Sequence, residues 1–185
     1  MIDIHCHILP EIDDGPKSIE DSVYLAKVAV EEGIHTIIAT PHHKNGRYIN
    51  PKAKILEKVI ELNDRLKNEK VPLTILPGQE TAIHGEMLEG YEKGEILTLN
   101  ATQYLFVELP STHVPRYTEQ LIFDLQLKGI IPIIVHPERN QEIVEQPDRL
   151  YQLVKKGALA QITASSVVGG FGEKTKGFFR AINGG

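Results

Sequence analysis

The chain has 185 residues, 41% of them hydrophobic and 24% charged, which is typical of one globular domain with a sizeable core and excludes a disordered or membrane-embedded chain. Its net charge of −5 and its interspersed charges exclude a basic surface of the kind that binds nucleic acid. With one cysteine, Cys6, and no apolar run near the roughly 18 residues of a membrane span, we expect no disulfide, no signal peptide, no membrane insertion and a cytoplasmic location.

Short β-branched runs alternate with amphipathic patterns in the first part of the chain. Ser18, with Asp21 three residues on, is a typical helix N-cap, and Gly33 is a typical residue to follow a helix. Pro51 opens a long helical pattern, and proline is favoured at such a start. The elements predicted here are strands over 2–5, 35–40 and 73–76 and helices over 19–32 and 51–70.

The same alternation continues after a looser segment, residues 82–100, in which we expect a short helix and a minor strand. Alternating strands and helices predict a parallel sheet with helices outside it. A barrel-like sheet is the preferred architecture, and an open doubly wound sheet is the alternative. The elements predicted here are strands over 104–109, 131–135 and 159–163 and helices over 118–128, 147–156 and 171–182.

Potential metal ligands follow the predicted strands one after another. The carboxyl ends of parallel strands gather on one face, so residues far apart in the sequence can meet in one site there. Imidazole and carboxylate together suit Zn, Mn or Fe. The sequence therefore predicts a metal centre. Its candidate ligands are His5, His7, His42, Glu80, Glu108 and His136.

The His5-x-His7 pair gives this prediction a local geometry. Successive side chains of a strand point to opposite faces, so Asp3, His5 and His7 share one face and Cys6 faces away. Two or more bound ions can activate water for phosphoryl transfer without a protein nucleophile. A cysteine phosphatase would need an arginine at position 12, where this chain has Ile12, so that mechanism is excluded.

Three further residues are candidates with ordinary alternatives. The guanidinium of Arg139, just after His136, is placed to hold phosphate oxygens by paired hydrogen bonds, although a surface salt bridge is the simple alternative. Arg116 has a similar but weaker case. Asp14 lies in the run Asp13-Asp14-Gly15, which could be an ordinary turn, yet this run follows the first strand closely enough to reach the same face.

Several longer motifs carry a family resemblance: HCHILPEIDDGPKS, IIATPHH, PGQE, YLFVELP, VPRY and HPERN. They resemble the bacterial capsule and exopolysaccharide tyrosine-protein phosphatases of the PHP (polymerase and histidinol phosphatase) superfamily, from Met1 to about Phe171. The resemblance implies a distorted TIM-like (β/α) barrel with a trinuclear site, for which Mn²⁺ is the first expectation and Fe or Zn the alternatives. It also implies hydrolysis of phosphotyrosine on a partner bacterial tyrosine kinase.

Residue roles come from the same resemblance. His5, His7 and Glu80 would serve one ion. Glu108 and His136, with Glu80 bridging, would serve a second. Asp14 and His42 would serve a third, and Arg139 would bind the phosphate.

The sequence departs from the family at one point, because the family completes its site with a late D-x-H motif and no histidine follows His136 here. We therefore expect a single domain over 1–185 that lacks the last strands of the barrel and the ligands on them. Open strand edges would favour homo-oligomer formation.

The leading hypothesis is a metal-dependent protein-tyrosine phosphatase. The first alternative is a phosphatase of histidinol phosphate or another small phosphomonoester. The second, which the missing motif motivates, is a metal-binding module with little or no catalysis.

Overall fold

The computed structural model describes residues 1–168, so the helix predicted over 171–182 lies outside the described residues. Packing of the backbone divides the chain into two compact units. Unit one comprises Met1–Thr81 and Glu89–Gln103, and unit two comprises Ala82–Leu88 and the chain from Tyr104 on. Among residues 1–168, no helix combines the length and the apolar composition that crossing a bilayer requires.

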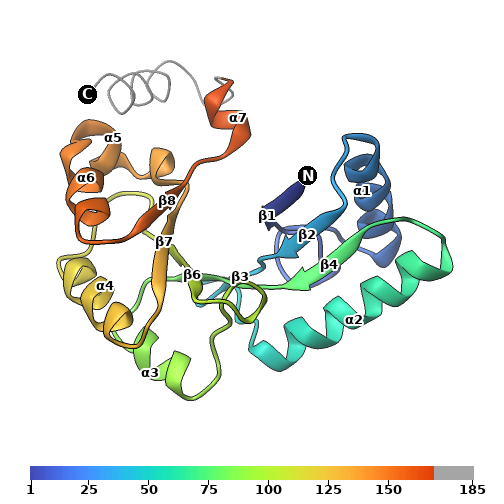
Figure 1. Cartoon of the computed structure of the whole chain (residues 1–185), viewed down its shortest axis with the longest axis horizontal. Helices are drawn as coiled ribbons and strands as arrows, with labels where there is room; N and C mark the ends of the chain where they lie inside the picture. The colour runs from blue at the N-terminus through green and yellow to red at the C-terminus, as the bar shows by residue number, and fades with distance from the viewer. Residues whose placement is uncertain (169–185) are drawn as a thin grey trace. The chain divides into compact units, whose positions relative to one another are not determined.

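Unit one is built on a three-stranded parallel sheet, with α1 and α2 beside it (Figure 1). Its strand order is β1-β2-β4, and two further short strands, β3 and β5, pair in parallel with His42 opposite Glu80. The elements that lie wholly or partly in unit one are β1 (Ile2–Cys6), α1 (Ile19–Glu31), β2 (Thr36–Ala39), β3 (His42–His43), α2 (Lys52–Asn68), β4 (Thr74–Pro77), β5 (Glu80–Ala82), α3 (Met87–Glu92) and η1 (Leu99–Ala101).

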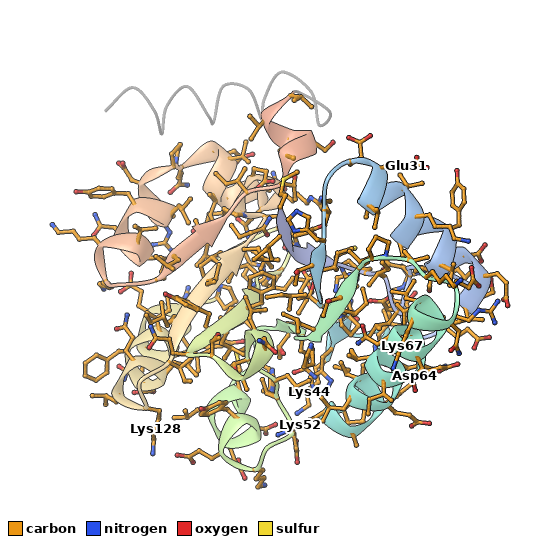
Figure 2. The ribbon with its side chains drawn as sticks, turned by 45° about the vertical axis from the view of Figure 1, so that its right-hand side comes forward. Glu31, Lys44, Lys52, Asp64, Lys67 and Lys128 are labelled. Carbon is orange, nitrogen blue, oxygen red and sulfur yellow. The ribbon has the colours of Figure 1, made fainter. Side chains whose placement is uncertain are left out.

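The helix boundaries of unit one follow the local sequence. Ser18 caps α1, and its Oγ accepts a hydrogen bond from the backbone N of Asp21 at 3.1 Å, as predicted. Gly33, with φ of +79°, adopts the left-handed conformation that ends the helix. The helix α2 carries an apolar stripe at helical spacing, Ile55, Val59, Leu62 and Leu66, whereas Asp64 and Lys67 lie on its exposed face (Figure 2).

The core of unit one joins these helices to the sheet. Buried side chains of β2 and β4, such as Ile37 and Ile75, share one apolar cluster with Leu62 of α2. Asn63 adds a polar connection, because its side chain donates to the carbonyl of Ile75 at 2.8 Å and accepts from the same residue's N at 2.9 Å. Asn63 thereby links α2 directly to β4.

Unit two contains three parallel strands in the order β6-β7-β8. The middle residues of β6 and β7 are buried, as the near-continuous apolar runs of 104–109 and 131–135 predict, whereas Leu159 and Ala160 of β8 are exposed. The elements are β6 (Tyr104–Glu108), α4 (Thr118–Leu127), β7 (Ile131–Val135), η2 (Pro137–Arg139), α5 (Gln141–Glu145), α6 (Asp148–Lys155), β8 (Leu159–Gln161) and α7 (Ala164–Val167).

The mixed α/β class with parallel strands is confirmed. Within residues 1–168 the strands are not closed into a barrel, so the distorted barrel stays a prediction, as does the single domain over 1–185. The short strands β3 and β5 were not predicted. Pro41 lies between β2 and β3, and β4 ends at Pro77, just before Gly78. A two- or three-residue strand leaves too little periodicity to recognise.

Candidate metal centre

His5 in β1 and His7 just after it present two imidazoles to the same point. Nε2 of His5 lies 3.2 Å from Oε2 of Glu80, and Nε2 of His7 lies 3.1 Å from the same oxygen. The ring centroids are 5.6 Å apart. His5 lies in β1 and His7 directly follows it, and both imidazoles reach the same carboxylate, as the shared face expected from the His-x-His spacing predicts.

The parallel pairing of β3 and β5 adds the third imidazole. His42 lies opposite Glu80 in the register, and its Nδ1 is 3.1 Å from Oε2 of Glu80. His42 follows β2 and Glu80 follows β4, as predicted, and each begins a short strand of its own. The Glu80 side chain is 0% exposed, so three ring nitrogens converge on one buried carboxylate oxygen.

The loop between β1 and α1 brings Asp14 to the same place. The loop is anchored by Ile8, Leu9 and Ile12, which are buried in the core of unit one. Asp14 itself is exposed, and its Oδ1 lies 3.8 Å from Nδ1 of His7 and 3.9 Å from Nε2 of His42. Asp14 therefore lies beside the imidazoles on the solvent side of the cluster.

Asp13 is a neighbour of this cluster that sequence reasoning did not distinguish from Asp14. Its buried carboxylate accepts hydrogen bonds from Nδ1 of His7 at 2.7 Å, from the N of Gly15 at 3.0 Å and from the N of His42 at 3.0 Å. The only sequence signal was the doubled aspartate of the Asp-Asp-Gly turn, and it does not say which of the two carboxylates points inward.

The close contacts among the ionisable groups of the cluster shift the pKa values of His7 and Asp13. Burial alone would lower the pKa of His7, but hydrogen bonds and charge from Asp13 and Glu80 outweigh it and raise the pKa to about 10. Burial likewise acts to raise the pKa of Asp13, yet its hydrogen bond to His7 prevails and lowers it. Without an ion, the site therefore holds a proton on His7 at neutral pH.

The residues present fit a divalent cation. Two triads, His5–His7–Glu80 and His7–Asp14–His42, have ligand atoms that all lie within 4.8 Å of one another. Imidazole nitrogen and carboxylate oxygen are the donors that Zn, Mn and Fe take. The Glu80 carboxylate is a buried negative charge surrounded by ring nitrogens. A bound cation would neutralise this charge in place of the protons on the imidazoles.

A buried polar network lies next to β3 and β5. His43 follows His42 in β3 and is buried. Its Nδ1 accepts a hydrogen bond from the N of Asn50 at 3.2 Å. The Asn50 side chain donates to the carbonyls of Ile12 at 2.9 Å and His42 at 2.8 Å. Gln79 donates to the carbonyl of Asn50 at 2.8 Å. This network holds the backbone of His42 in place.

The other predicted site residues belong to unit two. Glu108 ends β6 and is half-buried, and its carbonyl accepts from the N of Ile83 at 2.8 Å. His136 follows β7 in a left-handed conformation, with φ of 33°, and its N donates to the carbonyl of Gln161 at 2.8 Å. A left-handed histidine is uncommon and marks a constrained turn. Arg139, at the end of η2, is exposed.

Arg116 lies in an exposed loop that is tied to the segment after Arg139. The Asn140 side chain donates to the carbonyls of Pro110 at 2.6 Å and His113 at 2.9 Å. Glu142 accepts from the N of Val114 at 2.9 Å. The two candidate phosphate-binding arginines therefore sit on segments of unit two that hydrogen bonds hold together.

Unit one thus brings together five predicted ligands, and unit two carries the rest of the predicted set. His35 is not one of these ligands: it is exposed beside the N-terminal amine, with Nε2 2.9 Å from the Met1 nitrogen. Burial, with smaller contributions from Asp3 and Asp13, raises the pKa of the partly buried Cys6 to about 12. The five ligands in unit one are His5, His7, Asp14, His42 and Glu80.

Comparison with known proteins gives consistent matches over nearly the whole chain. Residues 1–183 match the family model described as capsular polysaccharide synthesis, CpsB/CapC. The tyrosine-protein phosphatase YwqE of Bacillus subtilis is 56% identical over 178 residues, which are 96% of this chain and 70% of that protein. The putative tyrosine-protein phosphatase CapC of Staphylococcus aureus is 46% identical, over 95% of this chain and 69% of that protein.

A solved structure is also similar to this chain over nearly its whole length. It comes from work on YwqE of Bacillus subtilis and CpsB of Streptococcus pneumoniae, described as unique metal-dependent tyrosine phosphatases. The TM-score is 0.95 at 54% sequence identity, and the match covers 99% of this chain and 74% of that chain.

Proposed function

This chain belongs to the CpsB/CapC capsular polysaccharide synthesis family, and we propose that it is a metal-dependent protein-tyrosine phosphatase. The observation that carries the proposal is the convergence of three imidazoles on the buried carboxylate of Glu80 in unit one. Relatives at 56% and 46% identity bear the name of tyrosine-protein phosphatase, and the similar solved structure is described as metal-dependent.

The proposed ligands of unit one are His5, His7 and Glu80 for one ion and Asp14 with His42 for another. Bound divalent ions supply Lewis-acid activation of water and neutralise the charge that develops on the phosphoryl oxygens. Glu80 holds three imidazoles around one point, so its charge sets the position of the centre. Mn²⁺ is the proposed ion, and Fe and Zn suit the same donors.

The residues of unit two have proposed roles that rest on the sequence motifs. Glu108 and His136 are proposed ligands of a further ion. Arg139 is proposed to hold the phosphate through paired hydrogen bonds, for which the planar guanidinium is suited, and Arg116 is proposed to contact the substrate. The exposure of both arginines is compatible with a substrate as large as a protein.

The proposed substrate is a phosphotyrosine side chain of a bacterial tyrosine kinase that controls capsule or exopolysaccharide synthesis. The membership in a capsular polysaccharide synthesis family supports this choice. A cytoplasmic location, supported by the single cysteine, and a distorted barrel of PHP type belong to the same proposal. Homo-oligomer formation is proposed only as a means of covering open strand edges.

Phosphate release from a phosphotyrosine peptide tests the proposal. The full chain is assayed with Mn²⁺ and with excess chelator, beside His42→Ala and the matched variant His35→Ala. We expect turnover that chelator abolishes, a loss on the order of 100-fold or more in His42→Ala, and little change in His35→Ala because His35 lies outside the cluster. Turnover that persists in chelator would contradict the metal mechanism.

Two further measurements separate the alternatives. A higher kcat/KM on histidinol phosphate than on the phosphotyrosine peptide would assign the chain to small phosphomonoesters. Elemental analysis that finds bound metal without turnover on either substrate would identify a binding module.

A further inference from the structure

Asp13 is buried beside the metal centre and has its own set of partners. Its side chain is 0% exposed, whereas the neighbouring Asp14 side chain is 60% exposed. Oδ2 accepts from Nδ1 of His7 and from the N of His42, and Oδ1 accepts from the N of Gly15. The same carboxylate therefore contacts the ends of β1 and β3 and the turn that carries Asp14.

The contact with His7 fixes which ring nitrogen faces the centre. With Nδ1 hydrogen-bonded to Asp13 at 2.7 Å, Nε2 points at Glu80 at 3.1 Å. An ionised carboxylate only accepts hydrogen bonds, so Nδ1 must carry the proton and Nε2 is left to bind an ion. Histidines that bind metals commonly depend on such an outer carboxylate for their tautomer and orientation.

The surrounding backbone is packed so that Asp13 has little freedom. A Cβ on Gly15 would lie 2.2 Å from the carbonyl oxygen of His7, so a side chain at this position would force the turn away from β1. The N of Glu11 also donates to the carbonyl of Pro16 at 3.0 Å, which closes the loop on itself. The turn therefore holds the Asp13 carboxylate at a fixed place behind His7.

We propose that Asp13 is a positioning residue of the metal centre, which selects the Nδ1–H tautomer of His7 and sets the backbone at His42. This inference rests on the proposed function only in that the cluster binds divalent ions. Asp13 itself is assigned no contact with substrate.

The substitution Asp13→Asn tests the role with almost no change in size. An amide has one oxygen, so in either orientation its NH₂ group faces a donor: the N–H groups of His7 and His42 in one case, and the N–H of Gly15 in the other. The first orientation favours the wrong tautomer of His7. We expect the Kd for Mn²⁺, measured by titration calorimetry on the full chain, to rise about 10- to 100-fold.

The matched control is Asp64→Asn, the same chemical change on the exposed face of α2 (Figure 2). It should leave the Kd within twofold of the wild type. In Asp13→Asn, raising the Mn²⁺ concentration should restore activity while the KM for phosphotyrosine peptide at saturating Mn²⁺ stays unchanged. A merely structural role would lower the melting temperature in chelator and leave the Kd unchanged, and that result would overturn the proposal.

A second measurement decides the question even if Asp13→Asn fails to fold. In the Zn²⁺-loaded wild-type chain, ¹⁵N NMR of the histidine rings should show His7 protonated at Nδ1 and bound through Nε2. Binding through Nδ1 would overturn the proposal. Because Kd and NMR need no turnover, a chain that binds Mn²⁺ without hydrolysing phosphotyrosine would contradict the proposed function alone, whereas a wild type that binds no ion would contradict both.

Discussion

Oε2 of Glu80 lies 3.1 Å from Nδ1 of His42, its partner across the β3–β5 ladder. The same oxygen lies 3.2 Å from Nε2 of His5 and 3.1 Å from Nε2 of His7. One carboxylate thus serves as the common neighbour of all three imidazoles, which makes it the most sensitive single position of the proposed centre.

Glu80→Gln should therefore abolish tight metal binding while keeping the shape of the side chain. The amide is neutral and places an NH₂ group or a weaker acceptor where three ring nitrogens meet, so we expect kcat/KM on a phosphotyrosine peptide to fall on the order of 100-fold or more. Metal content by elemental analysis should fall with it. Glu57→Gln, on the exposed part of α2, is the control. Retention of wild-type metal content in Glu80→Gln would show that the centre lies elsewhere.

Metal binding should release protons near neutral pH. In the metal-free chain Asp13 and Glu80 raise the pKa of His7 to about 10, above the ordinary 6.5, so its proton must leave when an ion binds. The raised pKa stabilises the metal-free fold fully below about pH 6.5, and this contribution is lost as the pH rises through about 10. Calorimetry at pH 7 in buffers of different ionisation enthalpy should report the release, and the Kd for Mn²⁺ should fall as pH rises. Heats independent of the buffer would contradict this prediction.

The Cys6 thiol should react slowly in the folded chain. Burial raises its pKa from 9.0 to about 12, so the thiolate fraction at pH 8 is lower by on the order of 1,000-fold than in the unfolded chain. The unfolded thiol ionises first, so the free energy of unfolding should decrease as the pH rises from about 9 toward 12. Reaction with a chromogenic disulfide in chelator, with and without denaturant, measures the first effect. Equal rates in both conditions would be inconsistent with a buried thiol.

Asn50→Ala should destabilise the fold and the centre together. The substitution leaves the carbonyls of Ile12 and His42 without the donors that they have in the wild type, and each unsatisfied buried group costs about 1–3 kcal/mol. Urea unfolding in chelator should show a loss of about 2–3 kcal/mol. The exposed Asn68→Ala, at the end of α2, should stay within about 0.5 kcal/mol of the wild type. Equal stabilities of the two variants would mean that the Asn50 hydrogen bonds contribute nothing to the free energy of unfolding.

Arg139→Lys should separate substrate binding from metal binding. Lysine keeps the charge but loses the planar pair of donors, so we expect the KM for phosphotyrosine peptide to rise about 10-fold. The Kd for Mn²⁺ should not change, since a cationic side chain is not a metal ligand. Steady-state kinetics at saturating Mn²⁺, with Arg47→Lys as an exposed control, tests this. An unchanged KM would remove Arg139 from the proposed phosphate site.

Much of the architecture could be predicted because its causes are local. The strand 131–135 matches β7 residue for residue, since a β-branched apolar run between Gly129 and the His136-Pro137 turn leaves little choice. The His5-x-His7 spacing predicted a shared face because strand alternation is a property of the backbone alone. Parallel pairing also follows from the alternation of strands with helices.

The unpredicted features depend on contacts between distant segments. The two-residue strand β3 exists through its pairing with β5, which no local pattern encodes. Asp13 and Asp14 have the same chemistry in sequence, and only the burial of Ile12 and the approach of Gly15 to His7 decide which of them turns inward. Asn50 and Gln79 were missed for the same reason, because their partners are backbone carbonyls and amides far along the chain.

The convergence on Glu80 also has a consequence for the lifetime of the protein. An ion bound there would connect β1, β3 and β5, three segments that separate on unfolding. It would therefore bind the folded chain and not the unfolded chain. At a free concentration 100 times the Kd, such an ion stabilises the fold by about 2.7 kcal/mol. Metal starvation would then remove the protein through faster degradation as well as through lost turnover, so that its abundance would follow the supply of the ion.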